Sequence, residues 1–197
     1  MNNKTGRKKA EPKKTVNLAL QGGGAHGAFA WGVLDKICED GRLSIDGLSA
    51  TSAGAMNTAV YSYGLMKHGA DGARQALHDF WKDVSETGQR FSPVKPTYWD
   101  QYFGGWENLN QSFAYNWFDT FTKVFSPYQF NPLDFNPLRD VLERHVDFDE
   151  IKRCDCANMF ICATNVRSNK IKVFHNEELS LDAVLASACL PMLFQAV

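Results

Sequence analysis

The chain has 197 residues, of which 44% are hydrophobic and 22% charged, with 21 Lys and Arg against 22 Asp and Glu. This composition is typical of one globular domain with a substantial core, and the net charge of -1 argues against a nucleic-acid partner. No apolar run approaches the roughly 18 residues of a membrane span and no signal-peptide pattern is visible, which predicts a cytoplasmic protein.

Positive charge gathers at the N-terminus, where the first 15 residues carry six basic residues and one acidic residue. Such a segment predicts a disordered tail over residues 1–15, ahead of one domain over residues 16–197. A tail that touches anionic lipid is the alternative, because each cation near such a surface gains roughly 1 kcal/mol. Peripheral membrane contact, or export by a signal that the sequence does not reveal, would change the expected location.

Two strand–turn–helix units are predicted at the start of the domain. Residues 16–21 form a short apolar run, typical of a buried strand, and residues 25–38 are small or apolar, as in a buried helix. A second strand over residues 47–51 leads through Ser52 into a second buried helix over residues 53–68. Two such units in succession predict an α/β fold with a parallel sheet and helices packed on it.

Further elements of both kinds are expected along the rest of the chain. Helices are predicted over residues 71–85, 137–145 and 179–189, strands over residues 159–166 and 171–175, an acidic turn at residues 147–150 and the start of an extended segment at residues 194–197. Residues 91–135 differ from all of these, since they hold 15 of the 25 aromatic residues and only six charges. We interpret them as an insertion in the domain.

A glycine-rich turn joins the first predicted strand to the first helix. Residues 22–27 read Gly-Gly-Gly-Ala-His-Gly, a spacing that dinucleotide-binding turns share. A dinucleotide site also needs an acidic residue at the end of the second strand, which here leads into Ser52 instead. The other interpretations are a tight turn without function and an oxyanion loop. In an oxyanion loop, backbone N–H groups of Gly22, Gly23 and Gly24 would stabilise an oxygen that gains negative charge.

The second predicted strand ends in Ala50-Thr51-Ser52-Ala53-Gly54. This matches the nucleophile elbow G-x-S-x-G, except that Ala50 replaces the first glycine and adds one methyl group. In an elbow, the Ser52 hydroxyl would lie at a helix N-terminus, with the Ala53 N–H available to the oxyanion and Gly54 giving space for the turn. A serine that only caps the helix is the alternative.

These motifs resemble those of the patatin-like phospholipases. The resemblance covers residues 18–54, with the triple-glycine loop and the Ser-Ala-Gly elbow, and residues 186–197, which look like the segment leading into the family's last catalytic motif. It implies a three-layer α/β/α fold with a mainly parallel sheet, a Ser–Asp dyad without catalytic histidine, and lipid degradation by ester hydrolysis without a cofactor. Ser52 is then the nucleophile, the three glycines form the oxyanion loop, and His26 has no catalytic role.

One part of the family pattern is missing from the chain. The family's catalytic aspartate lies in an Asp-Gly-Gly or Asp-Gly-Ala motif shortly after the segment that ends here at Val197. The two Asp-Gly pairs in this sequence begin at Asp46 and Asp71, which is too early. We therefore expect a domain that is incomplete at its C-terminus, and activity is doubtful because a serine hydroxyl needs an adjacent base.

Two functions remain open on this evidence. The first is a serine lipid acyl hydrolase acting on a phospholipid or another acyl-ester lipid, and the second is an inactive fragment or lipid-binding module without the base. A Ser-Asp-His triad would rescue catalysis with one of two histidines and one of three aspartates, namely His145 or His175 with Asp140, Asp147 or Asp149.

The aromatic insertion and the cysteines complete the expectations. The rings of residues 91–135 either form the core of an irregular subdomain or make a cap that accepts acyl chains or rests on a bilayer. Among the five cysteines, Cys154 and Cys156 lie two positions apart, but no second Cys or His pair at zinc spacing accompanies them. Reduced thiols are expected, with no metal and no cofactor.

Overall fold

The computed structural model describes residues 13–91, 117, 120–122 and 124–197. Residues 1–12 of the predicted tail lie outside the described residues. Most of the aromatic insertion at residues 91–135 lies outside them as well. The first strand begins at Lys14, two residues before the predicted start of the domain.

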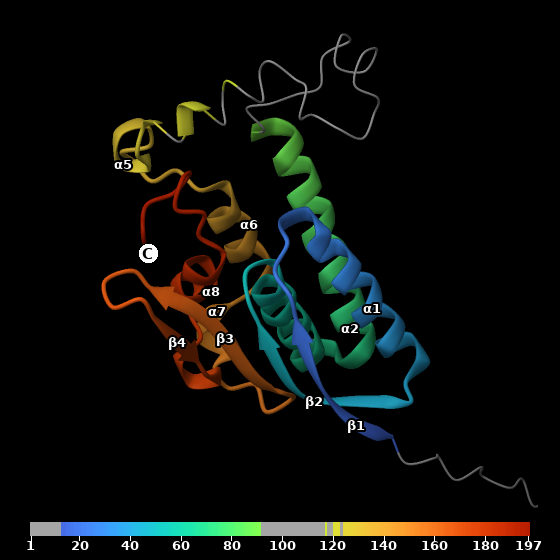
Figure 1. Ribbon diagram of the computed structural model, residues 1–197. Coiled ribbons are helices and arrows are strands. Elements are labelled where there is room, and N and C mark those ends of the chain that lie inside the picture. Colours follow the sequence, from blue (N-terminus) through green and yellow to red (C-terminus); the bar gives the residue numbers. More distant parts are fainter. Residues whose placement is uncertain (1–12, 92–116, 118–119, 123) are drawn as a thin grey trace, which may run out of the picture.

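Four strands form one sheet in the order β1-β2-β3-β4 (Figure 1). β1 (Lys14–Leu20) and β2 (Leu43–Ala50) are parallel neighbours, and β3 (Asn158–Asn165) is parallel to β2. β4 (Lys170–Phe174) is antiparallel to β3 and joins it through a turn. The sheet is therefore mainly parallel, which confirms the predicted α/β class.

The helices follow these strands in chain order. They are η1 (Gly24–His26) and α1 (Gly27–Asp40) after β1, α2 (Ala53–Phe91) after β2, α5 (Pro127–Phe130), α6 (Pro137–His145) and α7 (Phe148–Ile151) before β3, and η3 (Asn176–Glu178) and α8 (Leu181–Ala188) after β4. α6 has the predicted bounds. The predicted acidic turn is instead the short helix α7, because the Asp147 carboxylate accepts hydrogen bonds from the Asp149 and Glu150 amides and caps it.

The two parts of α2 differ in how many of their side chains are buried. Residues 53–62 are buried throughout, whereas the part after Asp71 buries only one stripe of side chains, which includes Leu77 and Phe80. The two parts were predicted as separate helices, and the backbone between them is indeed non-helical at His68 and Gly69, where Gly69 has a φ of +65°. Glycine adopts this conformation without steric cost, so the first helical part ends here and the second begins in a new direction.

The core lies between the sheet and α1, α2 and α8. Side chains alternate along each strand, so that Leu48, Met159 and Ile161 are buried against the helices while Asn17 and Ser49 on the opposite face are exposed. Among the described residues, α1, α2 and α8 contact the strands, and α1 and α8 also contact α2, so these three helices lie on the buried face. The described residues therefore supply the sheet and the helical layer of that face.

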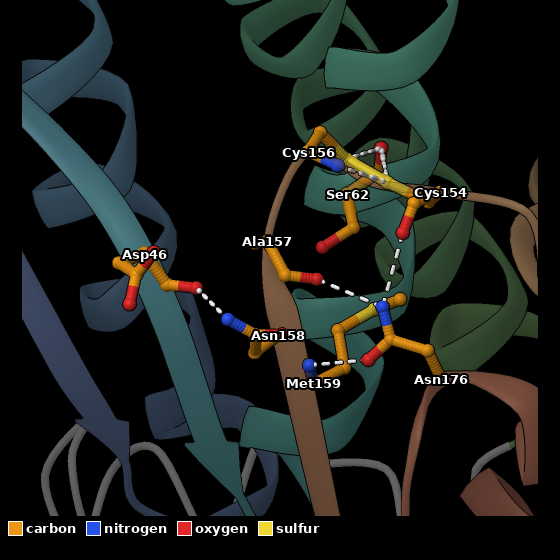
Figure 2. The surroundings of a disulfide bond; sticks show 8 residues. All are labelled: Asp46, Ser62, Cys154, Cys156, Ala157, Asn158, Met159 and Asn176. Carbon is orange, nitrogen blue, oxygen red and sulfur yellow. Dashed lines mark hydrogen bonds between the residues drawn. A yellow bond between two sulfur atoms is a disulfide. The ribbon is translucent and has the colours of Figure 1, made fainter.

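The amino end of β3 is held by an asparagine side chain and a disulfide (Figure 2). Asn176 donates from Nδ2 to the carbonyl oxygens of Cys154 and Ala157, at 3.0 and 2.9 Å, and its Oδ1 accepts from the Met159 amide at 2.6 Å. Cys154 and Cys156 form a disulfide with their Cα atoms 5.4 Å apart, within the usual range for such bonds. The expectation of reduced thiols is wrong for this pair, because the turn brings them together, and the other three cysteines are free.

The last residues of the chain also differ from the prediction. Residues 194–197 form no strand, and their polar groups bond to side chains of the segment around α5. The Gln195 amide donates to Asp134 Oδ1 at 3.2 Å, and the Ala196 amide donates to the Tyr128 hydroxyl at 3.2 Å. Amides with side-chain partners are not available for a strand ladder, which accounts for the irregular backbone.

Candidate active site

The turns after β1 and β2 lie side by side. Leu20 pairs with Ala50 at the ends of the two parallel strands, so the glycine-rich loop and Ser52 follow neighbouring strands at the same end of the sheet. We call this the carboxyl end of the sheet. Open α/β sheets bind their ligands in the crevice outside the carboxyl ends of the strands, which makes this the candidate site.

Ser52 has a strained backbone between β2 and α2. Its φ is +52°, in the left-handed region that residues other than glycine adopt at a cost of order 1–3 kcal/mol. α2 begins immediately afterwards, since the amides of Ala55 and Met56 donate to the Ser52 carbonyl at 2.8 and 3.2 Å. Among the described residues, no amide of α2 donates to the Ser52 hydroxyl, as a helix-capping serine would require. The side chain is partly exposed.

The glycine loop touches the serine turn. A β-carbon on Gly22 would lie 2.9 Å from the β-carbon of Ser52 and 3.4 Å from the carbonyl oxygen of Thr51, so only a hydrogen atom fits there. Gly24 has a φ of +56°, which favours glycine for a different reason. The loop thus needs glycine both for its close approach to Ser52 and for its own backbone.

Small residues let α2 begin directly against β1 and α1. Ala50 and Ala53 are each 4% exposed, and a β-carbon on Gly54 would collide with the carbonyl oxygen of Leu20. A β-carbon on Gly27, the first residue of α1, would lie 2.6 Å from that of Ala53. The extra methyl group of Ala50 is therefore accommodated in the core, whereas Gly54 has no space for a side chain.

A buried asparagine joins the starts of α1 and α2. Asn57 is fully buried, donates from Nδ2 to the Gly27 carbonyl at 2.9 Å, and accepts at Oδ1 from the Trp81 indole N–H at 2.8 Å. Each of these groups would lose a hydrogen bond in an apolar environment if the asparagine were replaced, and the loss would be costly. The network therefore holds the first residue of α1, just after the glycine loop, against the helix that carries Ser52.

Several backbone amides at this end of the sheet have no internal partner. Among the described residues, no group accepts a hydrogen bond from the amides of Gly23, Gly24 or Ala53. Ala53 is the first residue of α2, where the helix dipole favours negative charge. Amides of this kind are the donors that a developing oxyanion requires, so the arrangement can stabilise negative charge beside Ser52.

The structure does not assemble the alternative Ser-Asp-His triad. His145 lies 3.2 Å from Asp83, measured from Nε2 to Oδ2, rather than beside one of the three aspartates considered. The His175 ring packs edge-on against Phe160, and Asp147 caps α7. Within the described ranges, no carboxylate or imidazole forms a hydrogen bond with the Ser52 hydroxyl.

Asp83 is part of an ion-pair cluster between α2 and α6. Its carboxylate accepts hydrogen bonds from Arg144 at 3.0 Å from Nε and 2.9 Å from Nη2, in addition to its contact with His145. Burial alone would raise the pKa of Asp83, but the hydrogen bonds with Arg144 and His145 hold that pKa below its ordinary value. This cluster links the two helices and has no contact with Ser52.

Neither a metal centre nor a membrane-spanning helix is found in the part of the chain that the structure describes. No group of three or more His, Cys, Asp or Glu side chains there has the arrangement of a metal site. The helices of the same residues are too short or too polar to cross a bilayer.

Two residues at the carboxyl end were not singled out by the sequence. In the sequence, Asn57 is only a polar residue within a predicted buried helix, and this pattern alone does not identify its hydrogen-bond partners. Ser187 lies in the segment that resembles the family, at the end of α8, yet nothing local indicates that its hydroxyl accepts a hydrogen bond from the Ser52 amide at 2.9 Å. Both contacts join positions far apart in the sequence.

Comparison with known proteins gives a family and two distant structures. Solved structures that this chain resembles include the heterodimeric ExoU–SpcU complex of the type III secretion system of Pseudomonas aeruginosa (13% identity, TM-score 0.38, 90% of this chain and 36% of the other) and VipD of Legionella pneumophila (14%, 0.39, 94% and 44%). This chain therefore spans less than half the length of either neighbour. No curated protein matched. The sequence model of the patatin-like phospholipases matches residues 18–197, and the chain therefore belongs to the patatin-like phospholipase family.

Proposed function

We propose that the carboxyl end of the sheet is the active site of a serine hydrolase that cleaves ester bonds of phospholipids or other acyl lipids. The observation that carries this proposal is the contact between Gly22 and Ser52, which joins a strained serine to a glycine loop. Strained residues other than glycine gather at functional sites, because surrounding structure must hold them in place. Membership of the patatin-like phospholipase family supports the same chemistry.

The reaction would proceed through an acyl-enzyme. The Ser52 hydroxyl attacks the ester carbonyl and forms a tetrahedral intermediate, whose oxygen accepts hydrogen bonds from the Ala53 amide and from amides of the loop formed by Gly22, Gly23 and Gly24. Collapse of the intermediate releases the alcohol part of the lipid, and water then releases the fatty acid. An oxyanion donor of this kind contributes roughly 3–4 kcal/mol of transition-state stabilisation.

Both steps need a base, which takes the proton of the Ser52 hydroxyl in the first step and a proton of the attacking water in the second. The family resemblance implies an aspartate for this role, and the described residues place no carboxylate or imidazole on the Ser52 hydroxyl. That observation favours a second candidate function, in which the chain binds acyl lipids without hydrolysing them. The two functions differ in turnover and share the binding site.

Apolar side chains near α5 are the proposed contact with the lipid. Trp117 is 60% exposed and stacks on Phe121, with ring centroids 5.3 Å apart, and Phe121 in turn contacts Phe125 and Phe130. In the segment after α8, the Ala196 amide donates to the hydroxyl of Tyr128, which lies in α5 together with Phe130. Aromatic rings of this kind suit acyl chains or a bilayer surface.

A fluorophosphonate probe and a chromogenic ester test the proposal directly. We expect stoichiometric labelling of the wild-type chain, loss of labelling in Ser52→Ala, and unchanged labelling in the control Ser49→Ala, an exposed serine of β2. Any turnover should fall by ~10³-fold or more in Ser52→Ala, because no other group replaces the nucleophile. Far-UV circular dichroism establishes that both variants are folded.

The outcomes separate the candidate functions. Labelling with turnover supports the hydrolase, whereas labelling without turnover supports a competent nucleophile without its base. No labelling, with binding to phosphatidylcholine vesicles, supports the lipid-binding module. Ser52→Ala that is labelled as fast as the wild type would exclude Ser52 as the nucleophile.

A further inference from the structure

A hydrogen bond joins the serine turn to the distant helix α8. The Ser52 amide donates to the Ser187 hydroxyl at 2.9 Å, across 135 positions of sequence. The Ser187 hydroxyl donates in turn to the carbonyl oxygen of Cys162 in β3, at 2.7 Å. Ser187 lies in the last turn of α8, so its side chain links three elements at the carboxyl end of the sheet.

The chemistry of these groups fixes the direction of both bonds. A carbonyl oxygen can only accept, so the single Ser187 proton must point to Cys162. A lone pair of the Ser187 oxygen then faces the Ser52 amide, which can only donate. The hydroxyl has no further proton to give to a substrate, so its contribution to the site must act through Ser52.

The orientation of the Ser52 amide affects the backbone conformation of the turn. Rotation about the N–Cα bond of Ser52 sets its unusual φ of +52°, and an anchored N–H fixes the peptide plane from which that rotation is measured. The Ser52 carbonyl is held by the amides of Ala55 and Met56, at 2.8 and 3.2 Å, on the side of α2. On the other side, the nearest backbone hydrogen bond is that of the Thr51 amide to the Leu20 carbonyl at 3.3 Å. The hydrogen bond to Ser187 is the one that holds the Ser52 amide.

We propose that Ser187 is a positioning residue for the nucleophile. Its hydroxyl holds the Ser52 amide and thereby keeps the left-handed turn that presents the Ser52 side chain beside the glycine loop. The consequence for catalysis rests on the proposed function, whereas the hydrogen bond itself does not. Two separate measurements therefore address the two statements.

Amide hydrogen exchange of the full chain, measured residue by residue by NMR, tests the hydrogen bond. We expect a protected Ser52 amide in the wild type and about tenfold faster exchange in Ser187→Ala, the effect of removing one hydrogen bond of ordinary strength. Ser187→Thr keeps the hydroxyl and should restore the protection. The matched control is Ser180→Ala, which removes the cap at the other end of α8, where Ser180 Oγ accepts from the Ala183 amide.

Each result of the exchange experiment either supports or overturns the proposed role of Ser187. Unchanged exchange at Ser52 in Ser187→Ala overturns it, and so does equally faster exchange in Ser180→Ala, because the effect would then be general loosening of α8. If Ser187→Ala does not fold, the wild type still decides, since an unprotected Ser52 amide contradicts the hydrogen bond. Faster exchange confined to Ser52 and its turn, with rescue by Ser187→Thr, supports it.

Labelling by the fluorophosphonate probe then tests the consequence for the nucleophile. We expect Ser187→Ala to lower the maximal labelling rate about tenfold while the probe concentration at half-maximal rate stays the same, because the orientation of Ser52 changes and the binding surface does not. A change in the half-maximal concentration alone would contradict a positioning role. Absence of labelling in the wild type would count against the proposed function and leaves the exchange result to decide the role of Ser187.

Discussion

The two ends of the parallel strands differ in whether their backbone groups are hydrogen-bonded. At the carboxyl end, Ser52 has a strained φ, and the amides of Gly23, Gly24 and Ala53 have no partner among the described residues. At the amino end, one side chain, that of Asn176, satisfies three backbone groups next to a disulfide (Figure 2).

This difference separates the proposed active site from a region whose polar groups contribute to stability. Unpaired amides and a left-handed serine reduce stability unless the surroundings hold them, which is the task of Asn57 and Ser187 at the carboxyl end. At the amino end, the polar atoms of the Asn176 side chain all bond to backbone groups at the start of β3 or just before it. Substitutions at the two ends should therefore differ in their effect on Ser52.

The largest effect is expected for Asn57→Ala. It leaves the Gly27 carbonyl and the Trp81 indole N–H without their partner in the core and should lower the free energy of unfolding by about 3 kcal/mol. Urea denaturation measures this loss, and fluorophosphonate labelling of Ser52 should slow as well. Trp81→Phe removes one of the two hydrogen bonds and the outer ring atoms that lie against Gly27, so it should cost about 2 kcal/mol. Labelling at the wild-type rate in Asn57→Ala would break the proposed link between this network and the site.

A smaller effect is expected for Asn176→Ala at the amino end. Loss of its three hydrogen bonds should lower the free energy of unfolding by about 2 kcal/mol, less than for Asn57 because the site is only partly buried and water can replace the side chain. Labelling of Ser52 should not change. Slower labelling in this variant would show that the two ends are coupled and would contradict the division drawn above.

The smallest effect is expected in the helical layer, for Asp83→Asn. Loss of the ion pair with Arg144 should cost about 1 kcal/mol at neutral pH, because the pair is partly exposed. The pKa of Asp83 is lower in the folded than in the unfolded chain. Its contribution is therefore full above the unfolded value of about 4 and is lost as the pH falls through the folded value.

Urea denaturation at pH 7 and pH 3 measures this pH dependence. The difference in stability between the wild type and Asp83→Asn should shrink at the lower pH. The control Asp155→Asn changes an exposed carboxylate without a hydrogen bond in the described part of the chain, and it should leave stability unchanged at both values. An equal difference at pH 7 and pH 3 for Asp83→Asn would show that the ion pair does not set the dependence.

Much of the fold could be predicted from short-range patterns. The helix at 137–145 has the predicted bounds, because Asn136 caps it and Pro137 begins it. The first strands and helices agree to within a few residues, since alternating or continuous apolar runs are local signals. The strand before Ser52 begins four residues earlier than predicted, at Leu43, because pairing with β1 extends it over polar residues such as Ser44 and Asp46.

The sequence by itself determined the motifs, since a glycine loop after one strand and a serine turn after the next follow from residues adjacent in the chain. Only the tertiary structure decided which groups meet at them. Parallel pairing of β1 and β2 brings Gly22 against Ser52, and the packing of α8 brings the Ser187 hydroxyl to the Ser52 amide. Contacts of this kind depend on how separate elements pack, and a hydroxyl or an amide carries no local signal of the distant group that it will bond.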